Sequence, residues 1–263
     1  MVAPSRQAAA SRALARAGIS TLRIPEDLPV LRSLGFPENT EAGLRALKHL
    51  GLIKQVRRGL YEVREPTGRS KARLEDLLAA RFGDTPHLVS GWWALGHHQL
   101  TNQHVREVVV LATHARRPME IAGTLTRTLV TPADEIWGGR RQANGLNIAK
   151  PERALCDCVM RRNARIPAPR LAESLERFIE QSNSRDRLVR AIRKYNSPVV
   201  ARRLGYLVEA VTGERWPEVL AMTGTSHRLD PLDPGDETSR AVHEWQIRTH
   251  LTLSELLEHR VVS

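Results

Sequence analysis

The stretch from Thr40 to Val63, TEAGLRALKHLGLIKQVRRGLYEV, constrains the fold more than any other part of the chain. Its first half predicts a helix that ends at Gly51, because leucines recur at helical spacing on one side: Leu44, Leu47 and Leu50. Its second half predicts a tight two-stranded ribbon that turns at Arg57-Arg58-Gly59. We therefore expect a helix whose apolar side is buried, followed at once by a basic hairpin.

The residues before this stretch predict the rest of a small domain. Arg6–Ala17 is rich in Ala and Leu and predicts a helix, and Leu22–Ile24 predicts a short strand. Asp27 can cap a second helix that ends at Gly35, since its carboxylate can accept from free amides of the first turn. The order is helix, strand, helix, helix, strand, strand. This is the order of a winged helix-turn-helix domain, which we place at residues 1–65.

The positive charge is concentrated in the same part of the chain. The protein has a net charge of +11 and a pI near 10.7, which favours polyanionic partners. Residues 1–65 contain 11 Lys and Arg against 6 Asp and Glu, and residues 66–263 contain 29 against 23. The first quarter of the chain therefore carries nearly half of the excess. A basic N-terminal module on a weakly basic body is the simplest interpretation.

We predict that the third helix enters the major groove of double-stranded DNA and that the hairpin lies along the backbone. Arg45 is the candidate for contact with a base edge, because a guanidinium can bond two acceptors of guanine at once. The remaining candidates, several of them as phosphate contacts, are Thr40, Lys48, His49, Lys54, Arg57 and Arg58. The competing interpretation is a solvated helix face beside an ordinary charged hairpin.

After a linker at 66–70, residues 71–263 predict a larger mixed α/β domain with a mainly antiparallel sheet and C-terminal helices, so that the fold class is α+β. Aliphatic and β-branched runs predict strands at Val108–Leu111, Met119–Thr126, Thr128–Val130 and Leu146–Ala149. Helical patterns occur at 72–80, Pro151–Met160, Pro169–Glu180, Arg187–Tyr195, Val199–Val211 and Leu253–Leu257, and Asp230–Asp236 predicts a loop.

Composition excludes some classes of protein. No run approaches eighteen apolar residues, so we expect no transmembrane helix. The two cysteines, Cys156 and Cys158, are too close for an ordinary structural disulfide, and a reducing cytoplasm is the expected location. The first twenty residues, rich in Ala, Ser and Arg, also suit an organelle transit peptide. The first helix of the DNA-binding module needs the same residues, however.

Three motifs in the body resemble the AbiEi family of antitoxins. They are LVSGWWALGHHQLTNQ (Leu88–Gln103), LNIAKPERALCDC (Leu146–Cys158) and RRLGYLVE (Arg202–Glu209), and RGLYEV (Arg58–Val63) resembles the end of the family's wing. Each motif is weak alone, but their order and spacing together are fairly specific. Trp93 and Cys156 depart from the family pattern, and the region after Gly213 matches it poorly.

The resemblance implies a bacterial toxin–antitoxin operon. An AbiEi-like antitoxin represses its own promoter through the winged helix, acting as a monomer or a dimer on inverted repeats. Its larger domain counteracts a toxin that resembles nucleotidyltransferases, and it needs no cofactor. The residues alone leave open a winged-helix regulator whose C-terminal domain senses a ligand or a protein and which has no toxin partner.

The sequence contains no motif that predicts catalysis. None of the five lysines has the preceding acid of a restriction-type nuclease, and no glycine-rich phosphate loop or GxSxG motif is present. The histidines at 97, 98, 104 and 114 lack the spacing of a zinc site. Glu152, Arg153 and Asp157 predict helix capping and local ion pairing. We expect one of the two cysteines to be buried, and no enzymatic activity.

Overall fold

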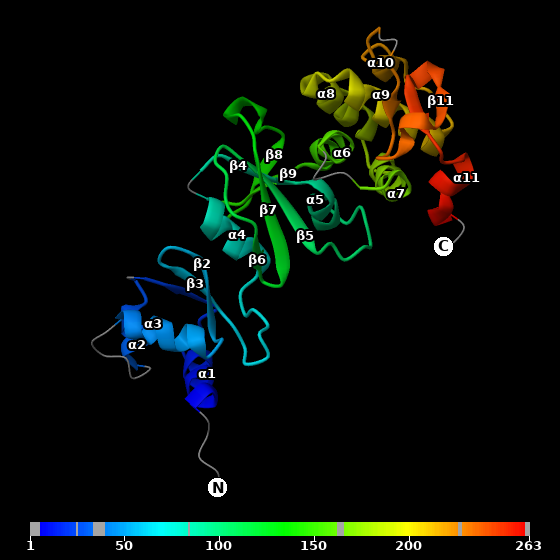
Figure 1. The fold of residues 1–263 in the computed structure, drawn as a ribbon. Coiled ribbons are helices and arrows are strands. Elements are labelled where there is room, and N and C mark those ends of the chain that lie inside the picture. Colours follow the sequence, from blue (N-terminus) through cyan, green and yellow to red (C-terminus); the bar gives the residue numbers. More distant parts are fainter. Residues whose placement is uncertain are drawn as a thin grey trace. The chain divides into compact units, whose positions relative to one another are not determined.

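The computed structural model describes residues 6–24, 26–33, 40–83, 85–161, 166–225 and 228–260. The chain forms two compact units. The N-terminal unit comprises residues 1–87, 116–127 and 142–146, and the C-terminal unit comprises 88–115, 128–141 and 147–263. Helices and strands of both units make this a mixed α+β protein (Figure 1). No helix in the described ranges has the length and apolar character needed to cross a membrane.

The first six elements of the N-terminal unit follow the predicted order. They are α1 (Arg6–Arg16), β1 (Thr21–Arg23), α2 (Leu28–Ser33), α3 (Thr40–His49), β2 (Ile53–Arg57) and β3 (Leu60–Val63). The strands form an antiparallel sheet in the order β1-β3-β2. Asp27 precedes α2 as predicted, but its carboxylate accepts from the Arg23 amide at 2.6 Å instead of from the first turn. Gly35, the predicted end of α2, lies outside the described residues.

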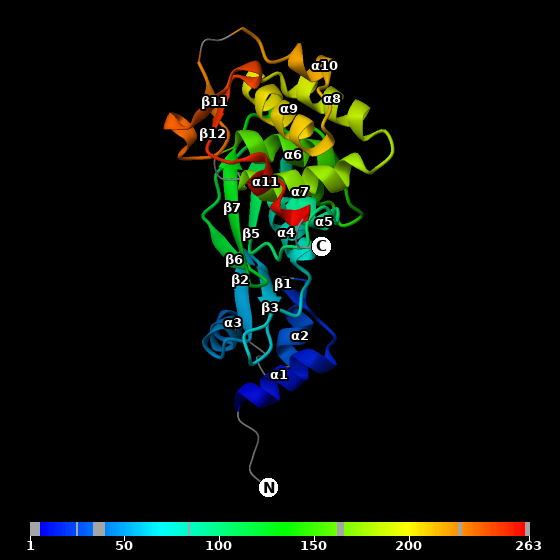
Figure 2. The ribbon, with the colours of Figure 1, turned by 90° about the vertical axis from the view of Figure 1, so that its right-hand side faces the viewer.

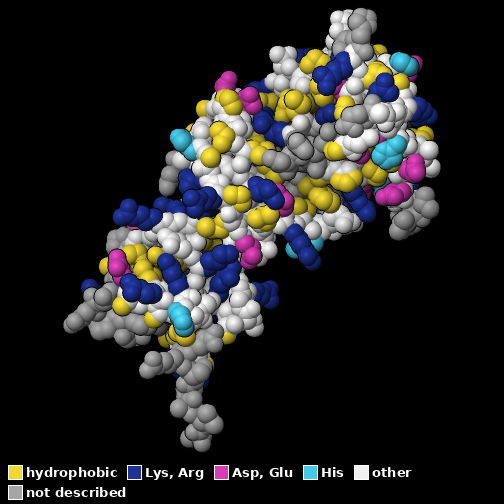
Figure 3. Space-filling model, viewed as in Figure 1, with side chains coloured by type: hydrophobic (Ala, Val, Ile, Leu, Met, Phe, Trp, Pro, Cys, Tyr) yellow, Lys and Arg dark blue, Asp and Glu magenta, His cyan; other side chains and the backbone are white. Residues whose placement is uncertain are grey.

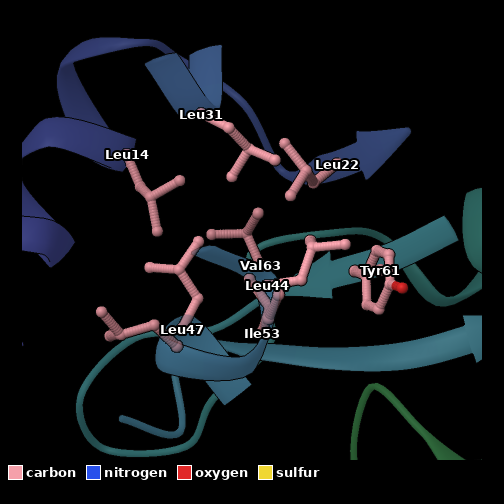
Figure 4. Packing of buried hydrophobic residues seen from close by; sticks show 9 residues of the cluster. Leu14, Leu22, Leu31, Leu44, Leu47, Ile53, Tyr61 and Val63 are labelled. Atoms are coloured by element: carbon pink, nitrogen blue, oxygen red, sulfur yellow. The ribbon is translucent and has the colours of Figure 1, made fainter. Parts of the chain in front are cut away.

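A leucine-rich core holds these elements together (Figure 4). Leu14 of α1, Leu22 of β1 and Leu31 of α2 are buried there. Leu44 and Leu47 of α3 meet them from the other side, together with Ile53, Tyr61 and Val63 of the sheet. Removing such side chains from water is the main favourable term in folding. The apolar side of α3 is therefore fixed inward, and its other side remains at the surface.

The N-terminal unit extends past the predicted boundary at residue 65. It includes α4 (Leu74–Phe82) and β6 (Met119–Ile121). Arg81 of α4 is buried and donates to the Val56 carbonyl of β2 and, at 3.2 Å, to the Arg117 carbonyl. The expected linker is a turn in which the Gly68 amide donates to the Glu65 carbonyl at 2.8 Å. A buried guanidinium that needs carbonyl partners explains why α4 belongs with the hairpin.

A six-stranded sheet has the order β6-β7-β5-β4-β9-β8. Its remaining strands are β4 (His87–Ser90), β5 (Glu107–Ala112), β7 (Thr124–Val130), β8 (Gly139–Arg141) and β9 (Asn147–Ala149). The sheet is mixed, since β6–β7 and β8–β9 are antiparallel whereas β4–β9 is parallel. The predicted strand Met119–Thr126 is extended at both ends but is not continuous, because Ala122 and Gly123 have φ of 49° and 79° and form a turn between β6 and β7.

The helices of the C-terminal unit agree closely with the prediction after residue 150, except that those at 91–97 and 217–220 were not among the predicted helices. The observed helices are α5 (Gly91–His97), α6 (Pro151–Met160), α7 (Ala168–Ile179), α8 (Ser184–Tyr195), α9 (Pro198–Thr212), α10 (Pro217–Leu220) and α11 (Leu253–Leu256). Figures 1 and 2 show α6 to α9 packed against one another. The expected loop after Asp230 is partly strand, because Asp230–Pro231 (β10) pairs with Ile247–Thr249 (β12), which also pairs with Arg240–Val242 (β11).

Candidate nucleic-acid interface

Helix α3 presents a basic face opposite its buried leucines. Arg45, Lys48 and His49 are exposed, whereas Leu44 and Leu47 are buried. Arg45 and Lys48 are three residues apart and therefore lie on one face of the helix. Thr40 begins α3, but its side chain lies outside the described residues. Three of the four predicted contact residues of the helix thus share a surface that solvent, or a ligand, can reach.

Lys48 connects this face to the hairpin. Its Nζ donates to Oε1 of Gln55 at 3.1 Å and lies 5.0 Å from the centroid of the Tyr61 ring. A cation over an aromatic face is held electrostatically by the ring quadrupole. Gln55 and Tyr61 were not among the predicted site residues. The alternation of strand residues could have placed Gln55 on the same side of the hairpin as the helix.

The hairpin ends in two exposed arginines. Arg57 closes β2, Arg58 and Gly59 form the turn, and both arginine side chains are exposed. Gly59 has φ of 75° and its carbonyl accepts from the Ile24 amide at 2.7 Å. A Cβ at this position would lie 2.8 Å from the Ile24 carbonyl oxygen, so only glycine fits the turn without displacement. The backbone thus fixes where the two arginines project.

Lys54 differs from the other predicted contact residues. It is half-buried, and its Nζ donates to the Glu120 carbonyl at 2.8 Å and lies 3.9 Å from a carboxylate oxygen of the same residue. These contacts occupy part of its hydrogen-bonding capacity within the N-terminal unit. In Figure 3, dark-blue Lys and Arg side chains gather on the part of the molecule that carries α3 and the hairpin. Such a surface attracts phosphate through release of condensed counterions.

In the C-terminal unit, Asp157 joins several elements through one buried carboxylate. It is fully buried and accepts from Arg153 at 2.9 and 3.0 Å, from Ser90 at 2.6 Å and from Arg161 at 3.0 Å. Tyr195 also donates to it at 3.0 Å. Burial, and then the nearby Asp157 carboxylate, raise the pKa of Tyr195, so its phenol remains protonated. The network confirms the predicted local ion pairing, and its oxygens are occupied by structural partners.

His98 and the two cysteines of the C-terminal unit lie in buried or half-buried positions within the fold. Nε2 of His98 lies 2.8 Å from the Ala149 carbonyl, and burial lowers the pKa of this imidazole. Cys156 and Cys158 are both completely buried, so the core includes the one cysteine that we expected there and the other as well. Burial, and then the neighbouring Asp157 charge, raise the pKa of both thiols. Thiols of this kind behave as small apolar side chains.

Comparison with known proteins identifies the fold alone. No family model and no curated protein matches the chain. Among solved structures, the chain is similar to the RV2827C protein from Mycobacterium tuberculosis, with a TM-score of 0.64 and 19% sequence identity. The alignment covers 99% of this chain and 96% of that chain. The two proteins therefore share an α+β architecture along nearly their whole length.

Proposed function

We propose that this protein is a DNA-binding repressor and antitoxin without enzymatic activity. The observation that carries the proposal is the basic surface formed by α3 and the β2–β3 hairpin. Its helix is fixed by buried leucines, whereas Arg45, Lys48, Arg57 and Arg58 remain exposed. A helix and an adjacent hairpin with this element order match the recognition helix and wing of a winged helix-turn-helix domain.

In this proposal α3 lies in the major groove and the hairpin follows the phosphate backbone. Arg45 has the side chain suited to the O6 and N7 atoms of guanine. Arg57 and Arg58 neutralise phosphates, and Lys48 spans the helix and the hairpin. We assign Lys54 a smaller contribution, because Glu120 already engages its ammonium group. A monomer, or a dimer on inverted repeats, would both present this surface to the operator.

The first test removes the two hairpin arginines. Each phosphate contact contributes about 0.9 to the slope of log K against log salt concentration, so Arg57→Ala/Arg58→Ala should lower that slope by up to about two contacts' worth. The measurement is a salt titration of binding to DNA from upstream of the gene. Arg69→Ala/Arg73→Ala removes the same charge from exposed positions of the same unit and should leave the slope unchanged. An unaltered slope in the hairpin variant would exclude the hairpin from the interface.

The antitoxin role follows from the resemblance of the body to AbiEi-type proteins. The expected partner is a nucleotidyltransferase-like toxin encoded beside this gene. Co-expression should restore growth of cells that produce the toxin. The hairpin variant separates the two roles, because it should lose promoter repression and still rescue growth if the C-terminal unit neutralises the toxin. Failure of the wild-type chain both to rescue growth and to bind its promoter would refute the proposal.

A second candidate is a winged-helix regulator whose C-terminal unit senses a ligand and which has no toxin partner. An open basic cavity in that unit, lined by Arg140, Arg190 and Lys194 among others, favours this candidate. Repression of the promoter that changes with a small ligand, in a genome without a neighbouring toxin gene, would distinguish it from the antitoxin.

A further inference from the structure

A strongly basic cavity of about 730 Å³ opens in the C-terminal unit, where α6, α8 and β8 come together. Six of its lining residues are cations, and Glu152 is its one carboxylate. The cations are Arg140, Lys150, Arg153, Arg187, Arg190 and Lys194. All of them belong to the C-terminal unit. Positive charge on a concave surface focuses the field and attracts anions.

The charges within the cavity are incompletely compensated. Arg153 is paired with Asp157, and Nε of Arg187 lies 3.4 Å from Oε2 of Glu152. Lys150, Arg190 and Lys194, in contrast, are exposed and form no ion pair with any carboxylate of the described residues. An anion that enters the cavity therefore finds cations whose charges are not already neutralised.

Helix α8 arranges three of these cations in one stripe. Arg187, Arg190 and Lys194 follow one another at spacings of three and four residues, which place them on one face of the helix. Like charges four residues apart on a helix destabilise it by about 0.2–0.5 kcal/mol. The stripe is thus unfavourable by itself, and a bound polyanion would relieve the repulsion.

The N-terminus of α6 forms another side of the cavity. Lys150 precedes the helix, and Pro151 and Glu152 of its first turn line the cavity. Pro151 has no N–H and the Arg153 amide donates to the Lys150 carbonyl at 3.0 Å, so the helix dipole, rather than a set of free amides, favours phosphate at this end. Trp137 is half-buried at the same place, and its ring already contacts two of the cations, since the Arg153 guanidinium lies 4.2 Å and Lys194 Nζ 5.1 Å from its centroid. Convergent cations beside a helix N-terminus suit a ligand that carries several negative charges.

We propose that this cavity binds a small ligand with two or more phosphate groups, a nucleoside di- or triphosphate. The phosphates contact Lys150, Arg190 and Lys194, and the rest of the nucleotide fills the remaining volume of the cavity. The volume lies within the range of about 300–1,000 Å³ that small-molecule sites occupy. A compact cavity also fits a nucleotide better than a nucleic acid, which needs a groove that continues along the backbone. The site does not depend on DNA binding by the N-terminal unit.

The test is calorimetric titration of the full chain at 150 mM salt with ATP, GTP, CTP, UTP, tripolyphosphate and adenosine. We expect at least one nucleotide to bind, and adenosine not to bind. Arg190→Ala/Lys194→Ala should weaken binding about 10- to 100-fold, since hydrogen bonds to charged groups are worth about 1.5–3 kcal/mol each. Arg185→Ala/Arg193→Ala removes the same charge from exposed positions of α8 outside the cavity and should have little effect.

A third variant should act in the opposite direction. Glu152→Gln removes the carboxylate of the cavity, so it should tighten nucleotide binding several-fold. A gain in affinity of this kind cannot result from loss of folding. Tripolyphosphate that binds as well as ATP would support the site and assign recognition to the phosphates alone. Three outcomes would overturn the proposal: no binding of any phosphate compound, equal losses in the two α8 double variants, or tighter binding of a single-stranded oligonucleotide that the same cavity variant abolishes.

Discussion

Asp157→Ala should lower the free energy of unfolding by about 3–5 kcal/mol, because it leaves a buried guanidinium without its counter-charge. Arg153 has a relative exposure of 1% and Asp157 of 0%, so water cannot take the place of the carboxylate. The Arg153 guanidinium also lies 4.2 Å from the Trp137 ring centroid and 4.9 Å from that of Tyr195, which holds it in place. Chemical denaturation of the full chain, with circular dichroism as readout, measures the effect.

Two further variants test the cause of this loss. Tyr195→Phe removes one hydrogen bond to the same carboxylate and should cost only about 1 kcal/mol. Arg153→Met/Asp157→Ala removes the buried pair and should be less destabilised than Asp157→Ala alone, since the buried guanidinium is removed with its counter-charge and Arg161 keeps its ion pair with Glu135. The single variants Arg153→Met and Asp157→Ala complete the cycle. If the loss of stability of the double variant equals the sum of these two single losses, the pair is not energetically coupled.

The order of elements in the N-terminal unit was predictable because it depends on local signals. Leucines at helical spacing specify the buried side of α3, and Gly51 and Gly59, with φ of 69° and 75°, specify where the helix and the hairpin turn. The association of α4 with the hairpin was not predictable. It depends on the Arg81 guanidinium and the Val56 carbonyl, which are 25 residues apart in the sequence.

In the C-terminal unit too, elements that depend on local signals were predictable, whereas contacts between distant residues were not. Helix α6 was predicted at its observed bounds, because Pro151 marks its first turn. Strands β10 to β12 have two or three residues each, and the residues of β10 pair with residues seventeen positions later in the sequence, so neither length nor alternation reveals these strands. The basic cavity joins residues from β8, α6 and α8. The stripe on α8 is visible in the sequence, but its position facing the N-terminus of α6 is a product of the fold.

The region after Gly213, which the family motifs do not explain, covers helix α9. Trp245 has a relative exposure of 1%, and its indole N–H donates to the carboxylate of Glu209 on that helix. Gly205 of α9 lies directly beneath the ring. A Cβ at Gly205 would lie 2.0 Å from Cζ3 of Trp245, far inside van der Waals contact. The glycine is therefore needed for the close approach of the tryptophan to the helix.

Gly205→Ala should consequently lower the free energy of unfolding by about 2 kcal/mol. Overpacking a core costs about 1–3 kcal/mol, and this overlap belongs at the upper end, whereas the higher helix propensity of alanine returns about 1 kcal/mol. Gly96→Ala is the matched control on α5, where the added Cβ would meet its nearest atom at 3.7 Å. That variant should be neutral or slightly stabilised, as measured by denaturant midpoint.

A second substitution tests whether the Trp245 ring causes the loss of stability of Gly205→Ala. Trp245→Phe shortens the side chain and alone should be destabilising, because it leaves a cavity in the core and loses the hydrogen bond to Glu209. Combined with Gly205→Ala, it should restore part of the lost stability, so that the double variant is more stable than the sum of the single effects predicts. Strict additivity would mean that alanine at 205 acts through the backbone of α9, and that the region after Gly213 is not packed through this contact.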